Sequence, residues 1–305
     1  MKSKSFKVAV ALLAFNRPEK TRQVFEKIRQ IKPPILLVSA DGPRQSHPED
    51  IEKCAAVRRI FSTIDWPCEL VTNFSEANLG SYRKNSDSLT WIFDTVDEAI
   101  ILEDDCIPEQ SFFYFCSELL ERYRHDERVM LISGNNFQFG HGLDQHSYFF
   151  SRYIHTWGWA AWKRTWRSVD LSMHRWPEFN SLRGLESLRL GSRSTRYWKG
   201  VFQNMYAGKR RFAWDYQLQL ALFMENGLAI SPSANLVKNI GFDQDSVHHK
   251  NRRHVLCNVP TSEMEFPLKH PPFVLPGFLE DQFISRFRFS LPRRAIRKAR
   301  LFLER

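Results

Sequence analysis

The segment AIILEDDCIPEQSFF, from Ala99 to Phe113, places three acidic side chains directly behind a short apolar run. Ionised carboxylates seldom lie at the edge of a buried segment unless a partner compensates their charge. In an extended chain alternate side chains share a face, so Glu103 and Asp105 point to one side and Asp104 to the other. The segment therefore predicts a buried strand that ends in a cluster of carboxylates.

The same order, a strand-like run followed by a helical stretch, recurs through the first 135 residues. Strand-like runs occupy residues 6–15, 35–40, 68–72, 99–102 and 129–133, and helical patterns occupy 16–31, 49–64, 85–96 and 111–123. Apolar strands that alternate with helices are typical of a mainly parallel sheet covered on both faces. The sequence therefore predicts the α/β class, with a mainly parallel sheet flanked by helices.

Polar side chains follow several of these predicted strands. Right-handed crossovers place the carboxyl ends of parallel strands on one edge of the sheet, where ligands bind. Asn16, Asp41, Asn78 and the acidic triplet Glu103–Asp105 all come directly after predicted strands. We expect these groups to lie along one edge.

Beyond residue 135 the regular alternation fades. Residues 151–170 are aromatic and basic, and helical patterns follow at 182–190, 198–206 and 214–226, the last stopped by Gly227. Trp159, Trp162 and Trp166 have the spacing of one helical face, which favours packing in the core. We divide the chain into residues 1–135 and 136–260, two halves of one domain, and a basic appendage at 261–305.

The overall charge indicates an anionic partner. The 305 residues carry a formal charge of +10, much of it in the segments VHHKNRR and PRRAIRKARLFLER. The second segment also places apolar residues among arginines, so peripheral contact with an anionic membrane is a hypothesis for it. The five cysteines are scattered without C-x-x-C spacing, which favours reduced thiols in the cytoplasm. The apolar run near the N-terminus is read as a buried strand rather than a signal peptide.

Carboxylate oxygens after a strand suit Mg²⁺ or Mn²⁺, which often keep positions open for substrate phosphates. The alternative is a charged turn exposed to water. The chain lacks G-x-x-x-x-G-K-[ST], H-E-x-x-H and G-x-S-x-G, and its first strand leads into FNRPEK instead of a glycine-rich loop. These absences argue against a P-loop enzyme, a dinucleotide oxidoreductase, a nucleotidylyltransferase and a zinc or serine hydrolase.

Four segments together resemble glycosyltransferases of the GT-A fold. They are VAVALLAFNRP (8–18), ILLVSADGPR (35–44), the stretch 78–115 that contains the E-D-D triplet, and WDYQLQLALFMENG with its continuation to 249. The order of these segments is most similar to the N-acetylglucosaminyltransferase I type and to bacterial family 2 glycosyltransferases. The resemblance implies a Rossmann-like, mainly parallel sheet at 1–135 for the nucleotide sugar and an irregular, aromatic-rich acceptor half at 136–260.

The resemblance also implies a donor and its contacts. The donor is a nucleotide sugar, with UDP as the nucleotide, bound together with Mn²⁺ or Mg²⁺. Asp105 is implied as the direct metal ligand, and Glu103 and Asp104 as contacts to ribose and sugar. Asp41 is implied to meet the base, and Arg17 to lie at the mouth of the nucleotide site, although a surface charge is an equal reading for Arg17.

Further roles follow from the same resemblance. It implies that Arg83 lies near the diphosphate, that His248 lies near the metal, and that Asp215 is the base that deprotonates the acceptor. A helix cap remains the alternative for Asp215, a surface charge for Arg83 and a solvated loop for His248. His155 and Trp157 are implied to flank the acceptor or the sugar.

The reaction that we expect is transfer of a sugar, with inversion, to a glycan or lipid-linked acceptor. A carboxylate base for the acceptor hydroxyl and a metal that steadies the diphosphate suit that chemistry. The alternative is a non-catalytic carbohydrate- or nucleotide-binding protein of the same fold. No nucleic-acid partner is expected, because the basic residues lack interleaved aromatics and no DNA-binding motif is present. We expect a cytoplasmic protein, with the basic tail as its contact to the inner face of the membrane.

Overall fold

The computed structural model describes residues 6–141, 145–209, 213–242, 256 and 259–289. The elements up to residue 133 alternate between strand and helix, as the sequence predicts. They are β1 (Ala9–Ala14), α1 (Pro18–Ile31), β2 (Ile35–Ala40), α2 (Glu49–Ile60) with the short η1 (Phe61–Thr63), β3 (Glu69–Phe74), α3 (Ser81–Thr95), β4 (Glu98–Glu103), β5 (Cys106–Pro108), α4 (Gln110–Arg122) and β6 (Val129–Ser133).

The later elements are shorter and less regular. They are β7 (Tyr148–Ser151), β8 (Trp159–Trp162), α5 (Lys163–Arg167), α6 (Trp176–Ser181), α7 (Gly184–Ser187), α8 (Ser192–Tyr206), α9 (Trp214–Met224), β9 (Leu228–Pro232), β10 (Val237–Asn239) and α10 (Phe278–Phe289). Among the described helices, none is long and apolar enough to cross a bilayer. The four described cysteines are free thiols.

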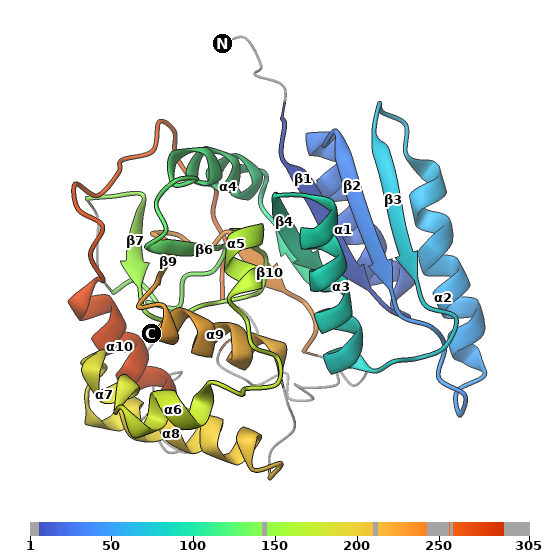
Figure 1. Ribbon diagram of the computed structural model, residues 1–305. Coiled ribbons are helices and arrows are strands. Elements are labelled where there is room, and N and C mark those ends of the chain that lie inside the picture. Colours follow the sequence, from blue (N-terminus) through green and yellow to red (C-terminus); the bar gives the residue numbers. More distant parts are fainter. Residues whose placement is uncertain (1–5, 142–144, 210–212, 243–255, 257–258, 290–305) are drawn as a thin grey trace, which may run out of the picture.

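One eight-stranded sheet runs through the molecule in the order β3-β2-β1-β4-β8-β6-β9-β7. The strands β3, β2, β1 and β4 are parallel neighbours, and β6 and β9 are also parallel, whereas β8 and β7 run antiparallel to theirs. The register pairs Leu13 with Glu103 and Ala14 with Ala40, so three strands end together. The α/β class with a mostly parallel, Rossmann-like sheet is therefore confirmed (Figure 1).

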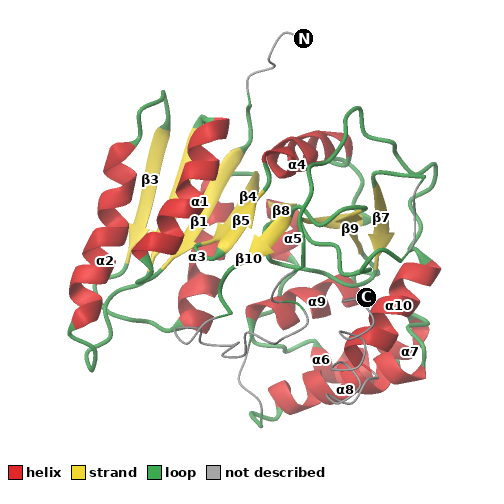
Figure 2. Ribbon diagram, turned by 180° about the vertical axis from the view of Figure 1, so that it is seen from behind, coloured by secondary structure: helices red, strands yellow, loops and turns green. Residues whose placement is uncertain are grey.

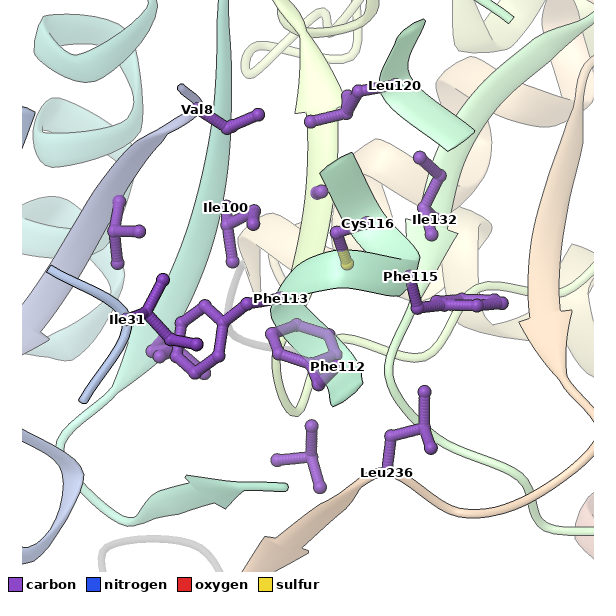
Figure 3. Packing of buried hydrophobic residues seen from close by; sticks show 14 of the residues in the cluster. Val8, Ile31, Ile100, Phe112, Phe113, Phe115, Cys116, Leu120, Ile132 and Leu236 are labelled. Atoms are coloured by element: carbon purple, nitrogen blue, oxygen red, sulfur yellow. The ribbon is translucent and has the colours of Figure 1, made fainter. Parts of the chain in front are cut away.

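Helices cover both faces of this sheet, because the side chains of each strand alternate between two core clusters. In β1, Val10 and Leu12 face the cluster beneath α1, α2 and α4, whereas Ala11 and Leu13 face the cluster beneath α3, α5 and α9. Figure 2 shows the strands as a central layer between helices. In Figure 3 the phenylalanines of α4 pack in the first cluster, beside Ile100 of β4 and Ile132 of β6.

A third core cluster lies beside the sheet and joins α6, α7, α8 and α10 (Figures 1 and 2). It is rich in aromatic rings, and Trp198 stacks on Phe202 at 5.3 Å between ring centroids. Ile284 of α10 is buried in this cluster, and Met264 and Leu268 are buried in the first cluster. The described part of residues 261–305 is therefore packed against the rest of the chain.

The prediction of a single helical face for the three tryptophans is wrong. The run WAAW is apolar throughout, and it forms β8, which pairs with both β4 and β6. Strand alternation sends Trp159 and Trp162 into different core clusters, and Trp166 joins Trp159 from α5. The expectation that all three pack in the core is confirmed.

Candidate functional site

The acidic triplet lies where β4 ends, in a tight turn that leads into β5. Glu103 is the last residue of β4, and Asp104 and Asp105 form the turn. The turn is held on both sides, because the backbone N–H of Asp104 donates to the carbonyl of Leu13 (2.9 Å) and that of Ile240 donates to the carbonyl of Asp105 (2.8 Å). Asp104 and Asp105 are both buried.

Arg17 spans the two aspartates from the residue before α1. Its Nη2 lies 2.6 Å from Oδ1 of Asp104, and its Nη1 lies 2.7 Å from Oδ2 of Asp105. Burial by itself would lower the pKa of Arg17, but the charges of Asp104 and Asp105 outweigh it and raise that pKa. The structure therefore joins Arg17 to the triplet, as a bridge between two buried carboxylates.

The triplet carries more negative charge than its one guanidinium compensates. Burial raises the pKa of Glu103, and the charges of Asp105 and Asp104 raise it further. Burial also raises the pKa of Asp104, against the opposing charge of Arg17. The ionised form of carboxylates that are buried close to one another is stabilised by an additional cation.

Asp215 lies in the first turn of α9, and its charge also raises the pKa of Glu103. The preceding Trp214 positions α9, since its ring stacks on Trp159 of β8 at 5.8 Å between centroids. Two features that are more than a hundred residues apart in the sequence, the triplet and Asp215, are thus brought into electrostatic contact.

The carboxylates suit a metal only as a partial ligand set. Within the described ranges, no group of three or more His, Cys, Asp or Glu side chains is arranged to hold a metal. Oδ2 of Asp105 binds Arg17, and a Cβ atom at Gly241 would collide with that oxygen. Because Mg²⁺ and ions like it are commonly held by one or two carboxylates plus substrate phosphates, Asp105 and its neighbours fit such an ion together with a bound diphosphate. His248 lies outside the described residues.

Asp41 organises the loop before α3. Its Oδ1 accepts from the backbone N–H groups of Gly42 and Leu79, both at 2.9 Å. Its Oδ2 accepts from Nδ2 of Asn78 (2.9 Å) and from the N–H of Gly80 (3.1 Å). A carboxylate has about four lone-pair sites, so Asp41 is saturated by the protein. The expected meeting of Asp41 and Asn78 at one edge is confirmed; contact of Asp41 with a base stays a prediction.

A second buried carboxylate, Asp50, was not identified from the sequence. It is fully buried and accepts from Nε and Nη2 of Arg44 (2.6 and 3.0 Å) and from Nδ2 of Asn16 (2.6 Å). The hydrogen bonds from Arg44 hold the pKa of Asp50 well below its usual range. In the sequence Asp50 looks like any acidic residue in the first turn of a helix, so no signal marked it.

Arg83 lies on the exposed side of α3. Its side chain is 71% exposed, and its described ion pair is a loose one of 3.6 Å with Asp87 of the next turn. The neighbouring Lys84 is the buried cation instead, and Nζ of Lys84 donates to Oδ1 and the carbonyl of Asn73 and to Oγ of Ser75. The role of Arg83 at the diphosphate stays a prediction.

His155 and Trp157 lie just before β8, at the end of that strand that meets the end of β6. Their backbone N–H groups donate to Oγ of Ser133 (3.1 Å) and Oδ1 of Asn135 (3.2 Å). His155 is buried, whereas Trp157 is half-buried between Phe137 and Phe242.

Comparisons with known proteins yield partial structural likenesses. No protein-family model and no curated protein matches the sequence. TarS from S. aureus (residues 1–349) is 10% identical at a TM-score of 0.36, over 54% of this chain and 49% of that one, about half of its length. HddC from Yersinia pseudotuberculosis is 10% identical at a TM-score of 0.31, over 52% and 78% of the two chains. A protein from Bacillus anthracis, assigned as a glucose-1-phosphate thymidylyltransferase in complex with sucrose, is 10% identical at 0.31, over 53% and 74%.

Proposed function

We propose that this chain is a metal-dependent glycosyltransferase that moves a sugar from a nucleoside diphosphate, with a UDP-sugar as the first candidate, to a glycan or lipid-linked acceptor. The observation that carries the proposal is the acidic turn after β4, whose three carboxylates face a single guanidinium. The charge of Asp215 adds to theirs and raises the pKa of Glu103. A ligand that brings its own cation would relieve the repulsion among the three carboxylates.

Arg17 and Asp105 form the diphosphate end of the proposed site. Arg17 is held by Asp104 and Asp105 and is 24% exposed, so its guanidinium is fixed in position yet reachable by a ligand. An Mn²⁺ ion beside Asp105 would neutralise charge on the diphosphate as it departs. His248 belongs to this end as a second metal contact, and Arg83 as a more distant cation.

The loop that Asp41 holds is the proposed binding place of the donor's nucleobase. Because Asp41 fixes the backbone of Leu79 and Gly80, it gives the loop one conformation against which a base can pack. Glu103, at the end of β4, and Asp104, in the turn, are the proposed contacts to ribose and sugar. Rigid positioning of the donor is what makes the reacting carbon accessible from one side.

Asp215 is proposed to accept the proton of the acceptor hydroxyl. The new bond forms between the acceptor oxygen and the anomeric carbon, and the bond from that carbon to the phosphate oxygen breaks on the opposite side, which inverts the configuration. The N-terminus of α9 favours the ionised form of Asp215. His155 and Trp157 are the proposed acceptor or sugar contacts, and the half-buried ring of Trp157 suits stacking on a sugar.

The test is release of nucleoside diphosphate from UDP-, GDP- and dTDP-sugars, with a panel of acceptors and with Mn²⁺ or EDTA. Asp215→Asn should retain donor binding but lose transfer by about 10²–10⁴-fold, the usual contribution of a general base. Asp94→Asn is the matched control, because Asp94 is exposed on α3. The helix-cap alternative is wrong for Asp215, because Ala213 occupies the N-cap of α9; normal transfer in Asp215→Asn would leave Asp215 only a stabilising role in the first turn of that helix. Donor binding without any turnover in the unaltered chain would point to the non-catalytic alternative.

A further inference from the structure

A hollow of about 500 Å³ lies at the edge of the sheet opposite the proposed donor site. It is lined from the starts of β1, β2 and β4, at Ala9, Ile35 and Glu98, and from the end of β8 and the adjoining α5, at Trp162 and Lys163. Parallel strands begin at this edge, so it is separated from the acidic turn by the length of the strands. None of the residues proposed above for donor or acceptor lines it.

The lining is strongly basic. Five cationic side chains contribute to it, and two acidic ones, Asp97 and Glu98. Glu98 is already engaged, because Nη2 of Arg124 lies 2.9 Å from its Oε1. Within the described part of the chain, the side chains of Lys7, Lys163 and Arg167 have no ion pair. Such a hollow attracts an anion.

Arg164 gives the hollow a cation that is fixed in place. Its Nη2 donates to backbone carbonyls, of which that of Val129 is the nearest at 2.8 Å, and its guanidinium lies 4.0 Å from the centre of the Trp162 ring. Neither contact supplies a negative charge. Arg164 is thus held beside the hollow by neutral groups; burial lowers its pKa, and the more distant charges of Glu127, Asp126 and Glu98 only partly oppose that effect.

Two buried N–H groups of the same lining have no acceptor. They are Nε1 of Trp162, a side chain that is 3% exposed, and Nε of Arg164. Buried donors in folded proteins are nearly always paired, although Nε of Arg58 is a further unpaired buried N–H group elsewhere in the described chain. Both N–H groups are closed to solvent, so the first contacts of an anion in the hollow are the side chains of Lys7, Lys163 and Arg167.

We propose that this hollow is a second ligand site, which binds a phosphate group on a molecule other than the sugar donor. Fixed arginine and free lysine side chains are the usual partners of phosphate. The volume exceeds that of a lone phosphate and lies within the range of small-molecule sites, so the phosphate is carried by a sugar-sized group. That group is either a soluble phosphate monoester or the headgroup of a phospholipid. The inference is independent of the proposed transferase activity.

The test uses a double variant, Lys163→Gln with Arg167→Gln, against a matched control, Lys53→Gln with Arg59→Gln on the exposed side of α2. Both pairs remove the same charge, and Arg164 is left intact because its carbonyl contacts support the fold. Binding of glycerol 3-phosphate and of inorganic phosphate is measured by titration calorimetry in EDTA at constant ionic strength. Hydrogen exchange then locates the protected segment.

A soluble ligand predicts saturable binding to the unaltered and control chains, weakened at least tenfold in the Lys163/Arg167 variant, with protection at residues 159–167. A lipid ligand predicts flotation with phosphatidylcholine vesicles that contain phosphatidic acid, reduced in the same variant only, and no flotation with pure phosphatidylcholine. Binding that is equal in both variants, protection confined to residues 99–110, or the absence of both saturable binding and flotation would overturn the proposal.

Discussion

Two groups of buried carboxylates lie along the same edge of the sheet, and they differ in the charge that surrounds them. Asp41 and Asp50, on the side of β2 and α2, have donors on both oxygens. Asp104 and Asp105, after β4, share the guanidinium of Arg17, and Oδ2 of Asp104 also accepts from the backbone N–H of Phe15 (3.2 Å). Burial and the neighbouring carboxylates nevertheless raise the pKa of Asp104 and of Glu103. The first pair stabilises loops, whereas the second group retains charge that a ligand can compensate. Crowding of buried carboxylates, which raises their pKa, thus separates the candidate catalytic acids from Asp50, whose pKa is lowered by Arg44.

The largest effect that this contrast predicts is on activity. Asp105→Asn removes the charge proposed to face the metal and diphosphate, so turnover should fall about 10³-fold. The free energy of unfolding should change by only about 1 kcal/mol, because the lost bond to Arg17 is offset by less repulsion within the triplet. Donor turnover and urea unfolding measure the two quantities. A large loss of stability with retained turnover would reverse the assignment.

Asp50→Asn should show the reverse pattern. It weakens the hydrogen bonds from Arg44, a side chain that is 39% exposed, and losing bonds to a charged group typically costs about 1.5–3 kcal/mol. Glu52→Gln on the exposed side of the same helix is the control, with an expected change below about 0.5 kcal/mol. Urea unfolding of both variants tests the prediction. Equal stability of the two variants would show that the saturated acid is not structural.

Backbone packing around Asp41 predicts a smaller loss of stability. A Cβ atom on Gly42 would lie 2.5 to 2.7 Å from the backbone of Ala77. Gly42→Ala should therefore displace the loop that Asp41 holds, at a cost of about 1–3 kcal/mol. Gly200→Ala is the control, because Gly200 lies within α8 with open space around it, and alanine there should add up to about 1 kcal/mol. Thermal unfolding that ranks the two variants in the opposite order would contradict this packing.

The smallest predicted effect is on the free energy of unfolding at acidic pH. The pKa of Asp50 is depressed in the folded state by hydrogen bonds from Arg44, so its ionised form contributes stability above its unfolded pKa, about 3.9. That stability is lost as the pH falls below this value toward the folded pKa. Unfolding free energies from pH 5 downward should therefore decline less steeply in Asp50→Asn than in the unaltered chain. Parallel curves would exclude this linkage.

The alternating half of the fold could be predicted from sequence because its strands are apolar throughout and its helices have one apolar face. For β2 the predicted range, 35–40, is that of the structure. The run at Trp159–Trp162 was harder, because four residues contain too little periodicity to distinguish strand from helix. Only its pairing with β4 and β6 makes it a strand.

The candidate site was predictable where acids follow a strand directly, and Glu103, Asp104 and Asp105 are such acids. It was not predictable where burial depends on distant packing. Asp50 looks like an ordinary helix-start acid until Arg44 and Asn16 close over it, and Lys84 rather than its neighbour Arg83 is turned into the protein. Adjacent residues on one helix differ in such roles through tertiary contacts that spacing does not encode.

Thermal unfolding with UDP, GDP, CDP or ADP, each with Mn²⁺ or with EDTA, tests most directly whether the acids after β4 hold a metal-bound diphosphate. A ligand at a hundredfold its dissociation constant adds about 2.7 kcal/mol and raises the midpoint by several degrees. The account predicts a rise with UDP and Mn²⁺ that disappears in EDTA and in Asp105→Asn. The absence of a rise with any nucleotide, or a rise that persists in Asp105→Asn, would contradict it.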